Sequence, residues 1–347
     1  MTLAAAIASR DPDLLPSRRD EDWRWTGLRE LIRAVPPASP AGEWSSGGPW
    51  AAVPSDELVV VNGRAQNFSN LVRVGDGDSP TARLRFISTP DAGSHAAKIE
   101  VRVGRGADFL LLETYEGAAA DYVALAELEI TLAEGARLTR LILAEDAESG
   151  VSVSAATVTM NPGARLHQTL LTTGARRQRF QTRVAHPGEG AEVRLDGAYV
   201  LSGKRHADQT TVVDHVGPGG VTSQLTKGVA ADQARGVFQG KIVVARGADG
   251  TDARMAHHAL LLSDRAEIDA KPELEIYADD VACAHGNTVG ALSEEAIFYA
   301  RSRGIPEAEA KIMLTSAFLG EVVERIEHPA AREVAYAWLA DRLERLV

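Results

Sequence analysis

Cysteine is almost absent from this sequence: Cys283 is the only one in 347 residues. A single cysteine excludes a disulfide within the chain, and it excludes a zinc or iron–sulfur site with four cysteine ligands from this chain alone. Aromatic residues make up only 5% of the sequence, whereas glycine and proline number 31 and 15. A chain that is rich in turn residues and poor in large core side chains is expected to form many short strands.

Positive charge is also in short supply. The formal net charge is -11 and the isoelectric point is near 5.4, so the surface repels phosphate backbones and anionic lipids. We therefore expect neither nucleic acid nor a membrane as a partner. No run of about 18 apolar residues occurs, and the first ten residues lack a positive segment before their short apolar run. A cytoplasmic globular protein is the default expectation.

Common catalytic fingerprints are missing as well. The segment nearest to a phosphate-binding loop, G-V-F-Q-G-K-I at residues 236–242, has one residue too few between its glycines for a Walker A loop, and isoleucine follows its lysine. We therefore expect that this chain binds no ATP. The patterns G-x-S-x-G, H-E-x-x-H and G-x-G-x-x-G do not occur, so hydrolase and dehydrogenase templates lack support.

What the sequence does contain is a repeat. Glycines followed by small and then alternating apolar residues recur at steps of 27 to 29 residues, at Gly106, Gly135, Gly163 and Gly190, and more weakly at Gly219 and Gly247. A period of this length with strands inside it predicts the stacked coils of a β-solenoid. Each glycine is expected at a tight corner with positive φ, and the alanine that follows can pack inside the corner. The alternative is a β-sandwich, whose turn signals usually recur every ~8 to 12 residues.

Composition divides the chain into five expected regions. These are an N-terminal helical region at 1–35, a linker rich in proline, glycine and serine at 36–56, a small mixed α/β region at 57–95, the solenoid at 96–290 and a C-terminal helical domain at 291–347. In the first region, Trp23, Leu28, Leu31 and Ile32 are spaced as one apolar stripe of a helix over residues 20–34. In the third, Asn62-Gly63 predicts a type I′ hairpin.

The C-terminal region predicts three amphipathic helices. Ser293 is a suitable N-cap for the first, Gly304 suits its C-terminal end, and Pro306 and Pro329 mark the starts of the next two. Such helices can cap a solenoid or present an apolar groove to a partner, and the sequence alone does not separate these two.

One short segment carries candidate metal ligands. Residues 271–290, K-P-E-L-E-I-Y-A-D-D-V-A-C-A-H-G-N-T-V-G, place Cys283 two positions before His285. On a strand, residues i and i+2 point to the same face with Cα atoms ~6.6 Å apart. A thiolate and an imidazole can bind iron, zinc or copper, but two ligands do not complete a site, so a second chain would have to supply the rest. The alternative is that both residues only pack, with Cys283 as a small buried hydrophobe.

Other polar residues have simpler interpretations. His257 and His258 are adjacent, so on a strand they face opposite ways and cannot bind one metal; we interpret each as a core or surface histidine. A carbohydrate-cleaving cluster is conceivable, since β-solenoids often host such chemistry, although turn and cap roles are commoner for aspartate. Its members would come from Asp208, Asp214, Asp232, Asp279 and Asp280.

Three long runs resemble a known family. They are D-Q-T-T-V-V-D-H-V-G-P-G-G-V-T-S-Q at 208–224, K-G-V-A-A-D-Q-A-R-G-V-F-Q-G-K-I-V-V at 227–244 and L-L-L-S-D-R-A-E-I-D-A-K-P-E-L-E-I-Y-A-D-D-V-A-C-A-H-G-N-T-V-G at 260–290. The runs E-E-A-I-F-Y-A-R-S-R-G at 294–304 and L-P-S-R-R-D-E-D-W-R-W-T at 15–26 extend the likeness. This chain resembles the SufB/SufD family of iron–sulfur cluster assembly scaffolds. The resemblance implies a mainly β fold, a right-handed parallel β-helix between helical ends, in agreement with the repeat.

Within the family, the D-D-V-x-C-x-H-G form and the short N-terminal region resemble the SufD branch more than the SufB branch, whose chains are generally longer and richer in cysteine. The resemblance implies a non-catalytic scaffold subunit that pairs with a SufB-like chain, binds a SufC-like ABC ATPase through its C-terminal helices and contributes to iron acquisition and cluster assembly at the SufB–SufD interface. It maps the family's assembly histidine onto His285 and the companion cysteine onto Cys283, which would hold iron or a transient iron–sulfur cluster with ligands from SufB. A homodimer of the isolated chain is also expected. The alternatives are a carbohydrate-active β-helix enzyme and a SufB-like scaffold.

Overall fold

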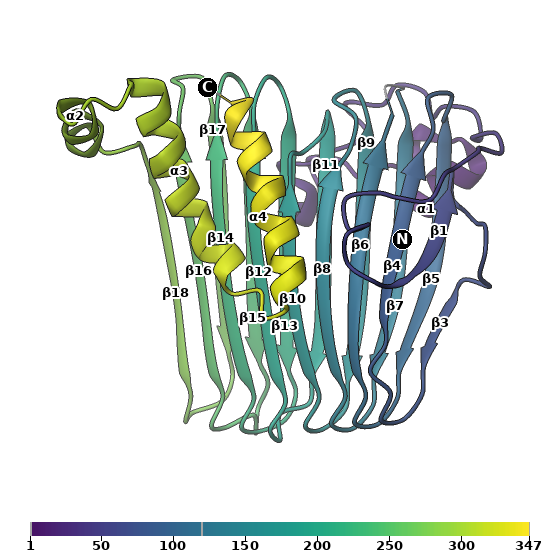
Figure 1. Ribbon diagram of the computed structural model, residues 1–347. Helices are drawn as coiled ribbons and strands as arrows, with labels where there is room; N and C mark the ends of the chain where they lie inside the picture. Colours follow the sequence, from purple (N-terminus) through teal and green to yellow (C-terminus); the bar gives the residue numbers. More distant parts are fainter. Residues whose placement is uncertain (1, 119–120, 347) are drawn as a thin grey trace.

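Two long β-sheets, wound from one chain, form most of the molecule (Figure 1). The computed structural model describes residues 2–118 and 121–346. Strands alternate between a ten-stranded and an eight-stranded sheet, and each sheet is parallel apart from the short β1–β2 hairpin. The result is a parallel β-solenoid of about 8 turns, which confirms the fold predicted from the repeat.

The ten-stranded sheet has the order β18-β16-β14-β12-β10-β8-β6-β4-β1-β2. Its strands are β1 (Asp56–Val61), β2 (Arg64–Ala65), β4 (Thr81–Ser88), β6 (Asp108–Gly117), β8 (Arg137–Glu145), β10 (Arg165–Thr172), β12 (Glu192–Leu201), β14 (Val221–Ala230), β16 (Asp252–Leu261) and β18 (Ala282–Gly290). The eight-stranded sheet has the order β17-β15-β13-β11-β9-β7-β5-β3. Its strands are β3 (Leu71–Val74), β5 (Ser94–Val103), β7 (Val123–Leu132), β9 (Val151–Met160), β11 (Arg177–His186), β13 (His206–His215), β15 (Arg235–Val244) and β17 (Glu267–Ile276).

The strand register reproduces the sequence repeat. Between β6 and β14, each residue lies beside the residue 27 to 29 positions further along the chain. All six repeat glycines have φ between 62° and 80°, where an L side chain would be strained. The alanines that follow five of them are at most 1% exposed. The predicted corner geometry is therefore confirmed: glycine makes the turn and alanine fills it.

The N-terminal region is less helical than the sequence suggested. It contains one α-helix, α1 (Thr2–Ser9), and two short 3-10 helices, η1 (Pro12–Leu14) and η2 (Glu21–Trp23). The helix expected over residues 20–34 is wrong, because those residues form η2 and a series of turns. Their apolar side chains pack instead on the outside of the solenoid, where Leu28 and Ile32 join a cluster with Val123 and Val151 of the eight-stranded sheet.

The region at 57–95 contains the predicted hairpin and the first strands of the solenoid. Asn62 and Gly63 have φ of 48° and 80° between the antiparallel strands β1 and β2, which confirms the two-residue turn. Strands β1 and β4 pair in parallel, and β4 pairs with β6. The sheets thus continue through the boundary expected at residue 95, and the division into five domains stays a prediction.

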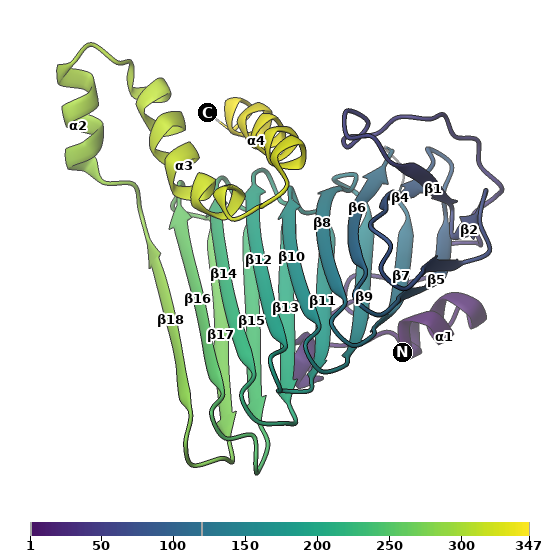
Figure 2. The same ribbon diagram turned by 60° about the horizontal axis from the view of Figure 1, so that its bottom comes forward.

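The three C-terminal helices are confirmed as α2 (Glu294–Ser302), α3 (Glu307–Glu324) and α4 (Pro329–Glu344). The Ser293 side chain accepts a hydrogen bond from the backbone of Ala296, as expected of an N-cap. Helices α3 and α4 lie along the outer face of the ten-stranded sheet and do not cap its end (Figure 2). Helix α2 stands away from both sheets, near β18. None of the helices in residues 2–118 and 121–346 has the length and apolarity needed to cross a membrane.

Candidate functional site

The last coil of the solenoid, β17 and β18, is uncovered. Each of these strands is the outermost one of its sheet, so each pairs on one side only. No residue of β17 or β18, both fully described, is buried, whereas most residues of the preceding strand β15 are. We call the surface formed by β17 and β18 the open end; in Figures 1 and 2 it lies at the left edge.

Cys283 and His285 both lie on β18 at this open end. Their register partners on β16 are Ala253 and Met255, which are buried between the two sheets. Since side chains directly beside one another in a sheet share a face, Cys283 and His285 point to the interior side of the last coil. The expected side-by-side projection of the two candidate ligands is therefore present.

The two side chains differ in their surroundings. Cys283 is half-buried and packs on an apolar cluster that contains Phe238 and Ile242. Burial raises the pKa of its thiol, and the nearby Asp252 carboxylate adds to that effect. His285 is exposed. Because His285 is exposed and Cys283 is only half-buried, an ion bound by both side chains would remain open to ligands from another molecule.

The described residues, 2–118 and 121–346, bring together no group of three or more histidine, cysteine or acidic residues suited to a metal ion. The two candidate ligands on β18 supply one sulfur and one imidazole nitrogen, which fit iron chemically but occupy only part of its coordination sphere.

The adjacent histidines and the aspartates have other roles in the fold. His257 and His258 face opposite sides of β16, as predicted, and His257 is buried whereas His258 is half-exposed. Asp208 begins an ion pair with Arg179 at 2.7 Å, and Asp214, six residues along the same strand, lies ~20 Å away.

Asp232 has a turn role, since its carboxylate accepts a hydrogen bond from the backbone of Gly203. Asp208 and Asp214 are too far apart to act as the paired carboxylates of a glycosidase. The loop-like segment at 236–242 is part of strand β15 and has no phosphate-binding turn.

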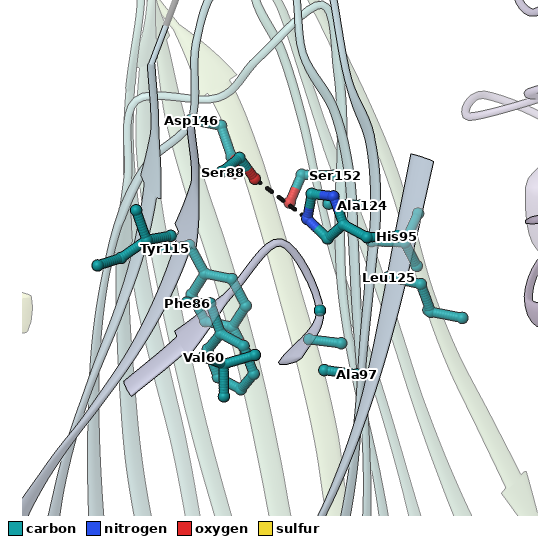
Figure 3. A pocket seen from close by; sticks show the side chains of 14 residues that line it. Val60, Phe86, Ser88, His95, Ala97, Tyr115, Ala124, Leu125, Asp146 and Ser152 are labelled. Carbon is teal, nitrogen blue, oxygen red and sulfur yellow. Dashed lines mark hydrogen bonds between the residues drawn. The ribbon is translucent and has the colours of Figure 1, made fainter. Parts of the chain in front are cut away.

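A small cavity lies inside the first coils (Figure 3). It measures about 20 Å³ and is lined by Ser88, His95, Tyr115, Asp146 and Ser152 among others. His95 hydrogen-bonds Ser88 at 3.3 Å, and burial, helped by the charge of Arg64, lowers its pKa to about 4. The cavity has room for about one water molecule, and its lining residues come from β1 to β9 and the turns between them, far from β18.

Helix α2 and its neighbours form a second exposed feature. Phe298 and Tyr299 of α2 are 74% and 61% exposed, and Met313 of α3 is also exposed. Of these three residues, Phe298 lines a hollow of about 800 Å³ between the two helices and the end of β16. The sequence indicated these helices but gave no means of telling which of their apolar residues would stay uncovered.

Comparisons with known proteins bear on this arrangement. Residues 86–318 match the family model described as the SUF system FeS cluster assembly, SufBD core domain. This match begins in β4, includes β18 and ends within α3, and it covers well over half of the chain. The chain belongs to the SufB/SufD family.

Individual members of the SufB/SufD family match over nearly the whole chain. The chain is 29% identical to the iron–sulfur cluster assembly protein SufD of Escherichia coli, over 95% of this chain and 89% of that protein. It is 28% identical to a SufBD family protein of Mycobacterium tuberculosis, over 97% of this chain and 92% of that protein. A shorter match, 32% identical over 40% of this chain and 32% of the relative, is to SufD of Bacillus subtilis.

Sequence reasoning missed one polar chain near the open end. Tyr199, His257 and Asn287 come from three different strands, β12, β16 and β18, and hydrogen bonds join them. The signal was weak, because the residues are separated by 58 and 30 positions. Only the step of one coil between His257 and Asn287 hinted at their contact.

Proposed function

We propose that this chain is a SufD-like scaffold subunit of an iron–sulfur cluster assembly complex, without catalytic activity of its own. The observation that carries the proposal is the position of Cys283 and His285 on the uncovered edge strand β18. In this proposal the cluster is the cargo: Cys283 and His285 hold iron or a nascent cluster transiently, and a SufB-like partner supplies the remaining ligands. We place this activity in the cytoplasm.

Shared ligation suits a cluster that must leave. Iron in a cluster is held mainly by thiolates, and this chain offers one cysteine. The raised pKa of Cys283 keeps its thiol protonated in the isolated chain, so iron binding there releases a proton. A site completed only when two chains meet can also come apart with them, which supports a role in assembly over storage. The single cysteine also supports a SufD-like over a SufB-like scaffold.

The open end has the properties of an interface. The outer edges of β17 and β18 present backbone groups without strand partners, and such edges pair readily with another strand. Ile276, Tyr277 and Val289 expose 41%, 59% and 43% of their surface there. A SufB-like solenoid would continue both sheets and cover these residues. In the absence of that partner, the open end of a second copy of this chain would serve, giving a homodimer.

The energy source would be another protein. The segment closest to a phosphate loop is a strand, so we propose that a SufC-like ATPase hydrolyses ATP for the complex. Phe298, Tyr299 and Met313 expose apolar side chains, and Phe298 lines the hollow between α2 and α3; both features support the C-terminal helices as its docking surface.

Anaerobic co-purification tests this proposal. The chain is co-expressed with candidate SufB-like and SufC-like chains, and iron and acid-labile sulfide are measured in the complex. We expect His285→Ala to leave the complex intact and to lower its iron and sulfide content. His258→Ala is the matched control, because His258 lies on the neighbouring strand but faces outward, and it should behave as wild type.

Two results would contradict the proposal. Recovery of this chain alone, without either partner, argues against the complex. Full iron and sulfide content in both His285→Ala and Cys283→Ser argues against the site. For the ATPase surface, Phe298→Ser should reduce recovery of the SufC-like chain while the SufB-like chain is still retained.

A further inference from the structure

A row of three hydrogen-bonded side chains, from Tyr199 through His257 to Asn287, ends at the open end beside His285. The Tyr199 hydroxyl lies 2.9 Å from His257 Nε2, and His257 Nδ1 lies 2.7 Å from Asn287 Oδ1. Tyr199 and His257 are fully buried, and the imidazole stacks on the ring of Phe238 with the centroids 4.8 Å apart and the planes 4° from parallel. The stacking and the two bonds fix the position of the imidazole.

Gly228 leaves the space that this row of hydrogen-bonded side chains needs. Tyr199 belongs to β12 and His257 to β16, and β14 runs between them with Gly228 in register with Tyr199. A Cβ atom on Gly228 would lie 1.8 Å from Cζ of Tyr199. Any other residue at Gly228 would therefore displace the tyrosine ring from its path across β14 to His257.

The buried tyrosine determines which imidazole nitrogen carries the proton. Within residues 2–118 and 121–346, His257 Nε2 is the one hydrogen-bond partner of the Tyr199 hydroxyl. A buried hydroxyl that accepted a bond there would leave its own hydrogen without an acceptor, which is unfavourable. Tyr199 therefore donates to Nε2, the proton of the neutral imidazole is on Nδ1, and Nδ1 donates to Oδ1 of Asn287.

This direction orients the amide of Asn287. Because Oδ1 accepts the hydrogen bond from His257, the two hydrogens of Nδ2 point away from His257. Among the described residues, Nδ2 has no hydrogen-bond partner. Asn287 is exposed and lies two residues after His285 on the same side of β18, so their Cα atoms are ~6.6 Å apart. The open end thus carries a fixed, unused donor beside the proposed iron ligand.

We propose that Asn287 Nδ2 donates a hydrogen bond to a sulfur anion bonded to the iron that His285 holds, and that His257 and Tyr199 are positioning residues for this donor. The inference rests on the proposed function. Sulfide of a nascent cluster and a cysteine thiolate of the partner are both acceptors of this kind. A hydrogen bond to such a sulfur atom stabilises the negative charge of the sulfur.

The first test concerns the isolated full chain and needs no iron. Nitrogen-15 NMR of histidine-labelled protein reports which imidazole nitrogen carries hydrogen. We expect the proton of His257 on Nδ1, and in Tyr199→Phe we expect this preference to weaken while the ring is retained. A wild-type proton on Nε2 would overturn the proposal, because the amide of Asn287 would then be reversed.

The second test uses the complex co-purified with the SufB-like and SufC-like chains. The rate at which acid-labile sulfide is lost to a chelator is compared among variants. Asn287→Ala removes one hydrogen bond to an anion, so we expect this variant to lose acid-labile sulfide about 10-fold faster than wild type. Asn287→Asp retains an oxygen for His257 but removes the donor, so it should also lose sulfide faster.

A matched control comes from the opposite face of the same strands. His258 Nδ1 lies 2.7 Å from Thr288 Oγ1, in the neighbouring register position but outside the solenoid, so Thr288→Val should leave the rate unchanged. If His285→Ala lowers sulfide content while Asn287→Ala and Asn287→Asp keep the wild-type rate, the role of Asn287 is refuted and the proposed function stands. If His285→Ala and Cys283→Ser both keep the wild-type iron and sulfide content, the proposed function itself fails.

Discussion

Replacing Arg140 by methionine should destabilise the solenoid strongly. Arg140 and Glu113 lie inside the core, and both are at most 1% exposed. The guanidinium donates to both carboxylate oxygens, with Nε–Oε1 at 2.5 Å and Nη2–Oε2 at 2.8 Å, and its Nη1 donates to Gln168 at 2.7 Å. In Arg140→Met the Glu113 carboxylate loses both of these donors and keeps the hydrogen bond from the Tyr115 hydroxyl at 3.2 Å.

The expected magnitude follows from this loss of partners. Removing one member of a buried, hydrogen-bonded ion pair leaves an uncompensated charge and costs about 3 to 5 kcal/mol. That is a large fraction of the ~5 to 15 kcal/mol that stabilises an ordinary domain. Replacing both members by apolar residues removes the uncompensated charge, so the double variant Glu113→Leu/Arg140→Met should recover most of the loss.

Urea unfolding of the full chain, followed by circular dichroism, measures these differences. The control is Lys98→Met, because Lys98 and Glu129 form an ion pair of similar length, 2.6 Å, with both side chains more than half exposed. Solvent screens such a surface pair, so it contributes little to stability. If Arg140→Met changes the unfolding free energy no more than Lys98→Met does, the pair is not sealed inside the solenoid and the reasoning is wrong.

Three further predictions concern other parts of the molecule. Burial and the neighbouring His186 lower the pKa of His215 to about 3 from an ordinary 6.5, so below pH 6.5 the unfolded chain binds more protons than the folded chain. The free energy of unfolding should therefore decrease as the pH is lowered below 6.5, by up to about 1.4 kcal/mol per pH unit. His215→Gln should flatten this dependence in urea titrations. Because burial raises the pKa of Cys283, alkylation of the isolated chain by iodoacetamide should still accelerate above the ordinary thiol pKa; a plateau near neutral pH would contradict this. Gly135→Ala should lower stability by ~1 to 2 kcal/mol, since φ is 66° there; an unchanged thermal midpoint would refute the corner geometry.

The repeat was predictable because every coil of a solenoid needs the same residue types at the same interval in the sequence. Each coil must turn the same corner, so Gly106, Gly135 and Gly163 recur with positive φ, and the alternation of apolar residues between them follows from the two faces of a strand. The Asn62-Gly63 hairpin and the Ser293 cap were equally readable, because both depend on residues within a few positions of one another.

Residues 20–34 show where local reasoning fails. Their apolar spacing suited a helix, but Arg179 of β11 holds this segment open: its guanidinium lies 4.5 Å from the Trp23 ring and donates to the carbonyl of Asp22 at 2.7 Å. Leu28 and Ile32 then bury themselves on the sheet. Contacts with residues more than 90 positions away outweighed the helical preference, and no pattern within the segment reveals them.

The candidate site divides in the same way. From the sequence alone came the solenoid, the common face of Cys283 and His285, and the shortage of ligands, since strand periodicity and composition are local properties of the chain. The tertiary structure alone decided that β18 is an uncovered edge, that the C-terminal helices leave this edge free, and that Tyr199 reaches Asn287 through His257. Which coil ends the stack, and which side chains meet across coils, depend on contacts between distant residues, and these exist only once the chain has folded.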